Sequence, residues 1–147
     1  MELIPITRKG QSQKPIAHLP DEAAEVGKVF FGLYQSVGYQ PPWLGYFAVI
    51  GDQCIGTCGF KSPPENNRVE IAYYTFPAFE GKGMATHMAK TLVDIARESA
   101  PNVIIAAQTL PAEGASTTIL KKLGFKNVAT LQHPEDGMVW EWKLITK

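Results

Sequence analysis

Residues 68–99 decide the fold, and they read RVEIAYYTFPAFEGKGMATHMAKTLVDIARES. The stretch begins with an apolar run, Arg68–Phe76, that is typical of a strand. A loop with two glycines around a lysine follows, and then a helix whose apolar stripe consists of Ala85, Met88, Ala89, Leu92, Ile95 and Ala96. A strand followed by a long helix, with another apolar run after it, predicts a right-handed parallel crossover.

The segments on either side of this stretch complete a mixed pattern. Before it we expect a strand over residues 2–7, a helix from Asp21 as N-cap, and a hairpin of residues 45–50 and 53–60 around Gly51-Asp52. After it we expect a buried strand over residues 102–110, a helix over 115–125 closed by Gly124, and strands over 126–132 and 137–144. This order predicts an α/β fold with a central mixed β-sheet flanked by helices on both faces, formed by a single domain over residues 1–147.

Composition limits the partners. The chain has 147 residues, in which 14 basic residues balance 14 acidic ones. Without a broad basic field, we expect it to bind neither nucleic acid nor an acidic membrane surface. The sequence contains no apolar run of membrane-spanning length, and its first residues lack the apolar core of a signal peptide. We therefore expect a cytoplasmic protein.

The cysteines and histidines predict no metal site. Cys54 and Cys58 are four residues apart on a predicted strand, which puts them on one face about 13 Å apart. That separation is too long for a disulfide. The three histidines stand alone in the sequence, so we expect no bound metal and interpret both cysteines as small core residues.

The glycine loop is a candidate anion site. A helix N-terminus presents unpaired N–H groups and the positive end of the helix dipole, and glycines leave those groups accessible. The segment Gly81-Lys82-Gly83-Met84-Ala85-Thr86 can therefore hold a pyrophosphate. It matches neither the nucleotide P-loop nor G-x-G-x-x-G, so a strand-to-helix turn that binds nothing is the alternative. We expect the carboxylate of Glu80, next to this loop, to turn outward or to cap the first turn.

Two motifs resemble those of GNAT-type N-acetyltransferases. The coenzyme loop of that family follows Q/R-x-x-G-x-G/A, and Gly83 and Ala85 match its last two fixed positions. Pro77 matches the family's usual proline at the end of the preceding strand. Residues 109–125, TLPAEGASTTILKKLGF, are similar to the family's N-x-x-S…L-x-K-L-G-F helix, with Ser116 at the serine position.

The last predicted strand resembles that of the subgroup that includes ribosomal-protein alanine acetyltransferases, so the resemblance covers roughly residues 46–144. It implies an enzyme that moves an acetyl group from acetyl-coenzyme A to a primary amine. The resemblance assigns the coenzyme to these residues: Tyr74, Thr75, Phe76, Gly81, Lys82, Gly83, Met84, Ala85, Thr86, Ser116 and Lys122.

Glu70 is the candidate general base, because an amine must lose a proton before it attacks a thioester. It shares a strand face with Ala72 and Tyr74, which lies either at the cleft or in solvent. Ser116 stands where relatives place a hydroxyl near the coenzyme sulfur, and it also suits a helix N-cap. Leu120 stands where many relatives have the tyrosine that protonates the departing thiolate, so the general acid has no candidate.

The aromatic segment before the hairpin is expected to select the acceptor, through Tyr34 and Trp43. A small-molecule amine and a protein N-terminus both stay open as acceptors. The strand over residues 137–144 offers an apolar edge on which a homodimer can form. The alternative function is a non-catalytic sensor or scaffold of the same fold that binds an acyl-coenzyme A, and the absence of tyrosine at Leu120 favours it.

Overall fold

The computed structural model describes residues 1–145, apart from the side chain of Ile145. Its elements follow the order β1 (Glu2–Pro5), α1 (Asp21–Val37), β2 (Gly45–Ile50), β3 (Gln53–Phe60), β4 (Arg68–Thr75), α2 (Met84–Ser99), β5 (Ile104–Thr109), α3 (Ala115–Lys122), β6 (Lys126–His133) and β7 (Gly137–Ile145). A single 3₁₀ turn, Pro77–Phe79, lies between β4 and the glycine loop. The sequence pattern did not reveal this turn.

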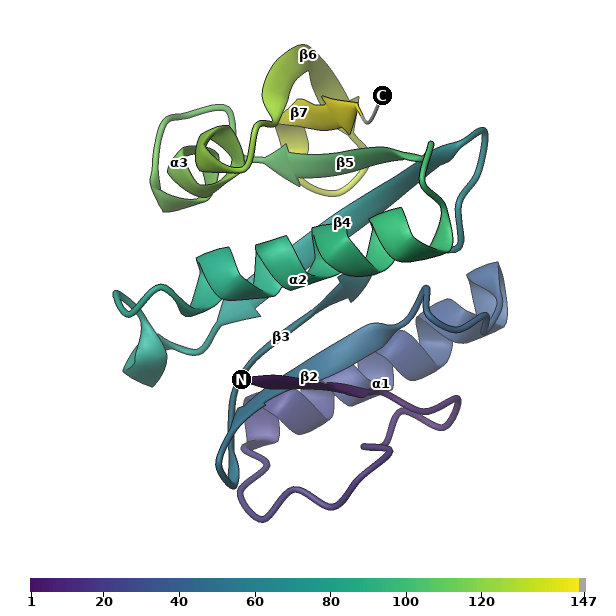
Figure 1. Ribbon diagram of the computed structural model, residues 1–147, viewed down its shortest axis with the longest axis vertical. Helices are drawn as coiled ribbons and strands as arrows, with labels where there is room; N and C mark the ends of the chain where they lie inside the picture. The colour runs from purple at the N-terminus through teal and green to yellow at the C-terminus, as the bar shows by residue number, and fades with distance from the viewer. Residues whose placement is uncertain (146–147) are drawn as a thin grey trace.

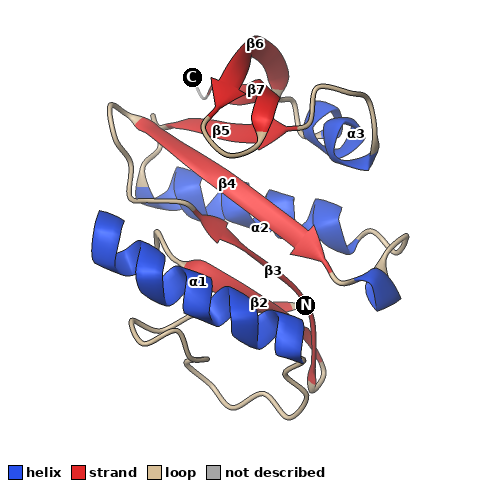
Figure 2. Ribbon diagram, turned by 180° about the vertical axis from the view of Figure 1, so that it is seen from behind, coloured by secondary structure: helices blue, strands red, loops and turns tan. Residues whose placement is uncertain are grey.

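The strands form one sheet in the order β1-β2-β3-β4-β5-β7-β6. Among the strands of residues 1–145, only β4 and β5 are parallel neighbours and the other pairs are antiparallel, so the predicted mixed sheet is confirmed. Figures 1 and 2 show α2 on one face of the sheet and α1 on the other. The helix α3 lies beyond the carboxyl end of β5, at one corner of the molecule (Figure 1).

The core lies between the sheet and its helices. The stripe predicted on α2 is buried at Met88, Ala89, Leu92 and Ala96, each 0% exposed. Both cysteines are buried and unpaired, as expected from their spacing. Within residues 1–145 no helix has the length and apolar character needed to cross a membrane, and no cluster of His, Cys, Asp and Glu is suited to a metal ion.

Two local predictions are wrong. The residue that caps α1 is Pro20, and Asp21 is already helical, because the Pro20 carbonyl accepts the Ala23 and Ala24 N–H groups. The strand β7 is not an edge, because it is hydrogen-bonded to β5 on one side and to β6 on the other. The free edge on that side of the sheet belongs to β6.

Candidate active site

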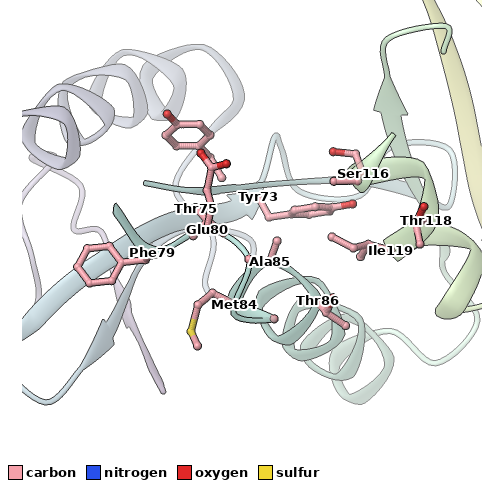
Figure 3. A pocket seen from close by; sticks show the side chains of 14 residues that line it. Tyr73, Thr75, Phe79, Glu80, Met84, Ala85, Thr86, Ser116, Thr118 and Ile119 are labelled. Carbon is pink, nitrogen blue, oxygen red and sulfur yellow. The ribbon is translucent and has the colours of Figure 1, made fainter. Parts of the chain in front are cut away.

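The main cleft arises where the parallel strands separate. β4 pairs with β5 only from Arg68 to Glu70, and beyond that point β4 stays with β3 while β5 stays with β7. The gap is a cavity of about 500 Å³ between the ends of β4, α2 and α3 (Figure 3). Its lining consists of Tyr73, Tyr74, Thr75, Phe79, Glu80, Gly81, Gly83, Met84, Ala85, Thr86, Ala115, Ser116, Thr118 and Ile119.

The N-terminus of α2 opens into this cleft without a cap. Its N-cap residue is Gly83, with φ 78°, and no side chain within the described residues 1–145 caps the first turn. Gly81 has a similar φ of 76°, which only glycine adopts without strain. A Cβ added to either glycine would meet no atom within 4 Å, so the space over both residues is open. The first turn therefore presents accessible N–H groups and the positive end of a 16-residue helix.

The backbone of β4 supplies further donors to the cleft. Phe76 N–H donates to the Ile55 carbonyl and Lys61 N–H donates to the Glu70 carbonyl, so even-numbered residues of β4 direct their backbone groups toward β3. Because these directions alternate along a strand, Tyr73 and Thr75 direct theirs toward the cleft. The Phe76 N–H is therefore not available to a ligand in the cleft, and Phe76 is in addition buried in the core. By the same alternation the backbone N–H of Tyr74 faces β3.

The structure brings together eight of the residues that the resemblance assigned to the coenzyme, namely Tyr74, Thr75, Gly81, Gly83, Met84, Ala85, Thr86 and Ser116. The two lysines, Lys82 and Lys122, are exposed and do not line the cleft. Neither does Phe76.

The serine on α3 is not a helix cap. Gly114 is the N-cap residue of α3, and its N–H donates to Thr117 Oγ1 at 2.9 Å. Ser116 lies in the first turn, exposed, with its side chain in the cleft (Figure 3). Glu113 accepts hydrogen bonds from Lys121 and Thr117, and these bonds lower the pKa of its carboxyl group. Its charge is thus paired with Lys121.

Several cleft residues were missed by sequence reasoning. Tyr73 alternates with Val69 and Ile71 and so reads as a core residue, yet its strand position lies past the end of β5 pairing and its ring faces the cleft (Figure 3). Phe79 belongs to the undetected 3₁₀ turn. Glu80 is exposed and lines the cleft, and within residues 1–145 its side chain makes no capping bond to α2, so the capping alternative is wrong.

The candidate base Glu70 lies just outside the main cleft. It is the last β4 residue that pairs with β5, and its side chain is 12% exposed. Lys61 Nζ lies 2.5 Å from Glu70 Oε2 in an ion pair without hydrogen-bond alignment, and Arg68 lies 3.5 Å from Oε1. Arg68 also contacts Glu141 Oε1 at 2.6 Å. Lys61 and Gln108 line a separate cavity of about 250 Å³ beside this polar cluster.

The aromatic residues expected to select the acceptor lie elsewhere. Tyr34 is 5% exposed, and its hydroxyl donates to the Ile6 carbonyl and accepts the Gly45 N–H, so it joins α1 to β1 and β2. Burial raises the pKa of Tyr34 to about 12, although the hydrogen bond from the Gly45 N–H acts in the opposite direction and lowers it. Trp43 packs edge-to-face on Phe60, with ring centroids 5.0 Å apart. Neither residue lines the main cleft.

Comparison with known proteins identifies the family. Residues 11–126 match the model of the acetyltransferase (GNAT) domain, which is most of the chain. The chain belongs to the GNAT acetyltransferase family. Among solved structures, this GNAT chain resembles a ribosomal L7/L12 α-N-protein acetyltransferase in complex with coenzyme A, with a TM-score of 0.68 and 17% identity, over 86% of this chain and 72% of that one.

Two further proteins are similar to this GNAT chain. It resembles the ribosomal-protein-alanine N-acetyltransferase of Brucella melitensis with a TM-score of 0.65 and 18% identity, over 83% of this chain and 78% of that one. A curated relative, the uncharacterized N-acetyltransferase p20 of Bacillus licheniformis, is 34% identical over 85 residues, or 57% of this chain. The alignment spans 48% of that relative, about half its length.

Proposed function

We propose that this GNAT chain is an acetyl-coenzyme A-dependent N-acetyltransferase that acts on a primary amine. One observation carries the proposal, namely that the uncapped N-terminus of α2 and the unpaired backbone of β4 open into the same cleft. The first suits a pyrophosphate, and the second suits an extended amide-containing chain that adds to the strand. A molecule with both parts, such as coenzyme A, fits this combination better than a simple anion.

The coenzyme would use the donors that this cleft offers. Its pyrophosphate would lie over Gly81 and Gly83, where the structure has open space, and would accept the first N–H groups of α2. Its pantetheine amides would pair with the backbone of Tyr73 and Thr75. Lys82 and Lys122 would offset phosphate charge from outside the cleft, which a flexible lysine can do through solvent.

The chemistry follows from where the thioester would lie. A backbone N–H of β4 would stabilise the oxyanion that develops when the amine attacks the carbonyl carbon. Glu70, one pleat before the exposed Ala72, would accept the amine proton directly or through a water. Lys61 and Arg68 hold its carboxylate in position at the point where β4 and β5 separate.

The acceptor would approach from the sheet face that carries α1. In Figure 1, α1 lies behind β2 and β3 rather than behind β4. Ala72 and Tyr74 of β4 are exposed. A small-molecule amine and a protein N-terminus both fit an open approach. The solved relatives named for ribosomal proteins favour a protein N-terminus as the first acceptor to test.

Binding and turnover test the proposal separately. Saturating coenzyme A, at about 100 times its Kd, should stabilise the fold by about 2.7 kcal/mol, and isothermal calorimetry should give a single site. An assay for free thiol, run over amino acids, polyamines and N-terminal peptides, should find an acceptor. No binding of coenzyme A or acetyl-coenzyme A would overturn the proposal.

A matched pair of variants tests the general base. Glu70→Gln should lower kcat by a factor of about 10²–10⁴ with little change in coenzyme affinity. Glu141→Gln removes a carboxylate from the same polar cluster and should lower kcat much less. Equal losses would show that the cluster acts only through structure. Binding without turnover on any amine would support the alternative, a non-catalytic acyl-coenzyme A sensor.

A further inference from the structure

Acetyl transfer leaves a thiolate on coenzyme A, and a hydrogen-bond donor at the sulfur would stabilise it. This inference rests on the proposed function. The position on α3 that resembles the family's tyrosine position is Leu120, which is 0% exposed and packed in the core. A side-chain donor would therefore have to come from another residue of the cleft. The hydroxyl side chains in the lining are Tyr73, Tyr74, Thr75, Thr86, Ser116 and Thr118.

Tyr73 is placed to reach the coenzyme's reactive end. It lies on β4, three residues past the last residue that pairs with β5, at the inner end of the cleft. Its ring extends from β4 toward α3, and its hydroxyl points to the side of the cleft where Ser116 and Ile119 lie (Figure 3). The Tyr73 side chain thus extends from the β4 wall of the cleft to the region beside α3, on the opposite wall. Tyr74 occupies the other face of β4 and is 50% exposed.

The Tyr73 hydroxyl has its hydrogen to donate. The hydroxyls of two other tyrosines donate hydrogen bonds to backbone carbonyls, Tyr34 to Ile6 and Tyr46 to Pro42. Within residues 1–145 no such bond involves the Tyr73 hydroxyl. Burial raises the pKa of Tyr73 to about 12, so the phenol keeps its proton throughout the neutral range. The phenol therefore remains a hydrogen-bond donor at neutral pH and does not lose its proton near pH 7.

We propose that Tyr73 is the catalytic hydrogen-bond donor to the departing sulfur of coenzyme A. The amine nitrogen forms the new bond to the thioester carbon, the carbon–sulfur bond breaks, and its electron pair stays on sulfur. The nitrogen proton goes to Glu70 or to water. Tyr73 donates a hydrogen bond to the thiolate and keeps its proton. The thiolate of a thiol with a pKa of about 8.5 is a weaker base than the Tyr73 phenolate, so the proton stays on the phenol oxygen.

The test uses coenzyme A itself and needs no acceptor. Coenzyme A is bound to the protein, and ionisation of its thiol is followed by thiolate absorbance from pH 6 to pH 10. A charge-assisted hydrogen bond should make the apparent thiol pKa about one to two units lower in the wild type than in Tyr73→Phe. Tyr39→Phe, which changes a tyrosine outside the cleft, is the control and should titrate like the wild type.

Turnover gives a second, independent reading. With acetyl-coenzyme A, Tyr73→Phe should lower kcat about 10- to 100-fold and leave KM nearly unchanged. With p-nitrophenyl acetate, whose leaving group needs no donor, the same variant should match the wild type. A uniform loss with both substrates would overturn the proposal, since it would indicate misplacement of the substrate.

The remaining outcomes are also decisive. An unchanged thiol pKa in Tyr73→Phe, or a shift found in Ser116→Ala instead, would overturn the proposal while the transferase activity stands. Should Tyr73→Phe fail to fold or bind, the wild type alone decides. Its affinity for coenzyme A, relative to the desulfo analogue, should rise at least tenfold from pH 7 to pH 9.5, and a constant ratio would refute the donor. No coenzyme binding by the wild type would overturn the proposed function itself.

Discussion

The sharpest test of the proposed coenzyme site is Gly83→Ala, compared with Gly51→Ala. Both glycines have positive φ, 78° and 63°, and a Cβ at either position would meet no atom within 4 Å. The main cost of each substitution to the free protein is therefore backbone strain, at about 1–2 kcal/mol. Both variants should lose a similar part of the free energy of unfolding, equivalent to about 3–6 °C in Tm.

Only one of the two glycines lines the cleft. Gly83 is the N-cap residue of α2, whereas Gly51 lies in the turn between β2 and β3. A methyl group on Gly83 occupies the open space through which a pyrophosphate would approach the first-turn N–H groups. We expect Gly83→Ala to weaken coenzyme A binding by at least about tenfold, or 1.4 kcal/mol, beyond the effect of Gly51→Ala.

Two measurements separate strain from binding. Thermal unfolding without ligand gives the strain in each variant, and calorimetry at a temperature where both are folded gives the affinity. Equal coenzyme affinity in Gly83→Ala and Gly51→Ala would refute the placement of the pyrophosphate over α2. A much larger loss of stability in Gly83→Ala than in Gly51→Ala would show that the loop carries a constraint beyond its φ.

Three further outcomes are expected. Arg68→Met removes the cation 2.6 Å from Glu141, whose side chain is 9% exposed. Urea unfolding should show a free energy of unfolding lower by about 2–3 kcal/mol, and a loss below about 1 kcal/mol would contradict this prediction. Glu80→Gln removes a negative charge beside the phosphates and should tighten coenzyme A binding about two- to threefold at low salt. Glu98→Gln, in the last turn of α2, is the control and should leave the affinity unchanged. A marked weakening in Glu80→Gln would mean that Glu80 organises the loop. Burial raises the pKa of the Cys54 thiol to about 11, above its value in the unfolded chain. The contribution of this thiol to the free energy of unfolding is therefore complete below about pH 9 and falls by about 2–3 kcal/mol as pH rises to 11. Cys54→Ala should flatten this decline in alkaline unfolding curves, and an unchanged slope would argue against it.

The sequence alone predicted the order of elements because its signals are local. Alternation in β4, the helical stripe of α2 and the turn at Gly51-Asp52 depend on neighbouring residues, so the mixed sheet with helices on both faces could be derived. The glycine loop was recognisable for the same reason. The N-cap of α1 and the 3₁₀ turn after β4 were not, because the φ that proline fixes at both places suits a helix start, a turn and an extended segment equally well.

The tertiary structure decided which side of each element the site uses. Whether Tyr73 faces the core or the cleft depends on where β5 leaves β4, and no residue near Tyr73 encodes that point. The same separation selects the cleft-facing amides. The packing of α1 on β1 and β2 buries the Tyr34 hydroxyl, and Glu70 contacts Lys61 directly and Glu141 through Arg68. Periodicity assigns a residue to a face of its strand, but only the packing of distant strands determines whether that face meets a core or a ligand.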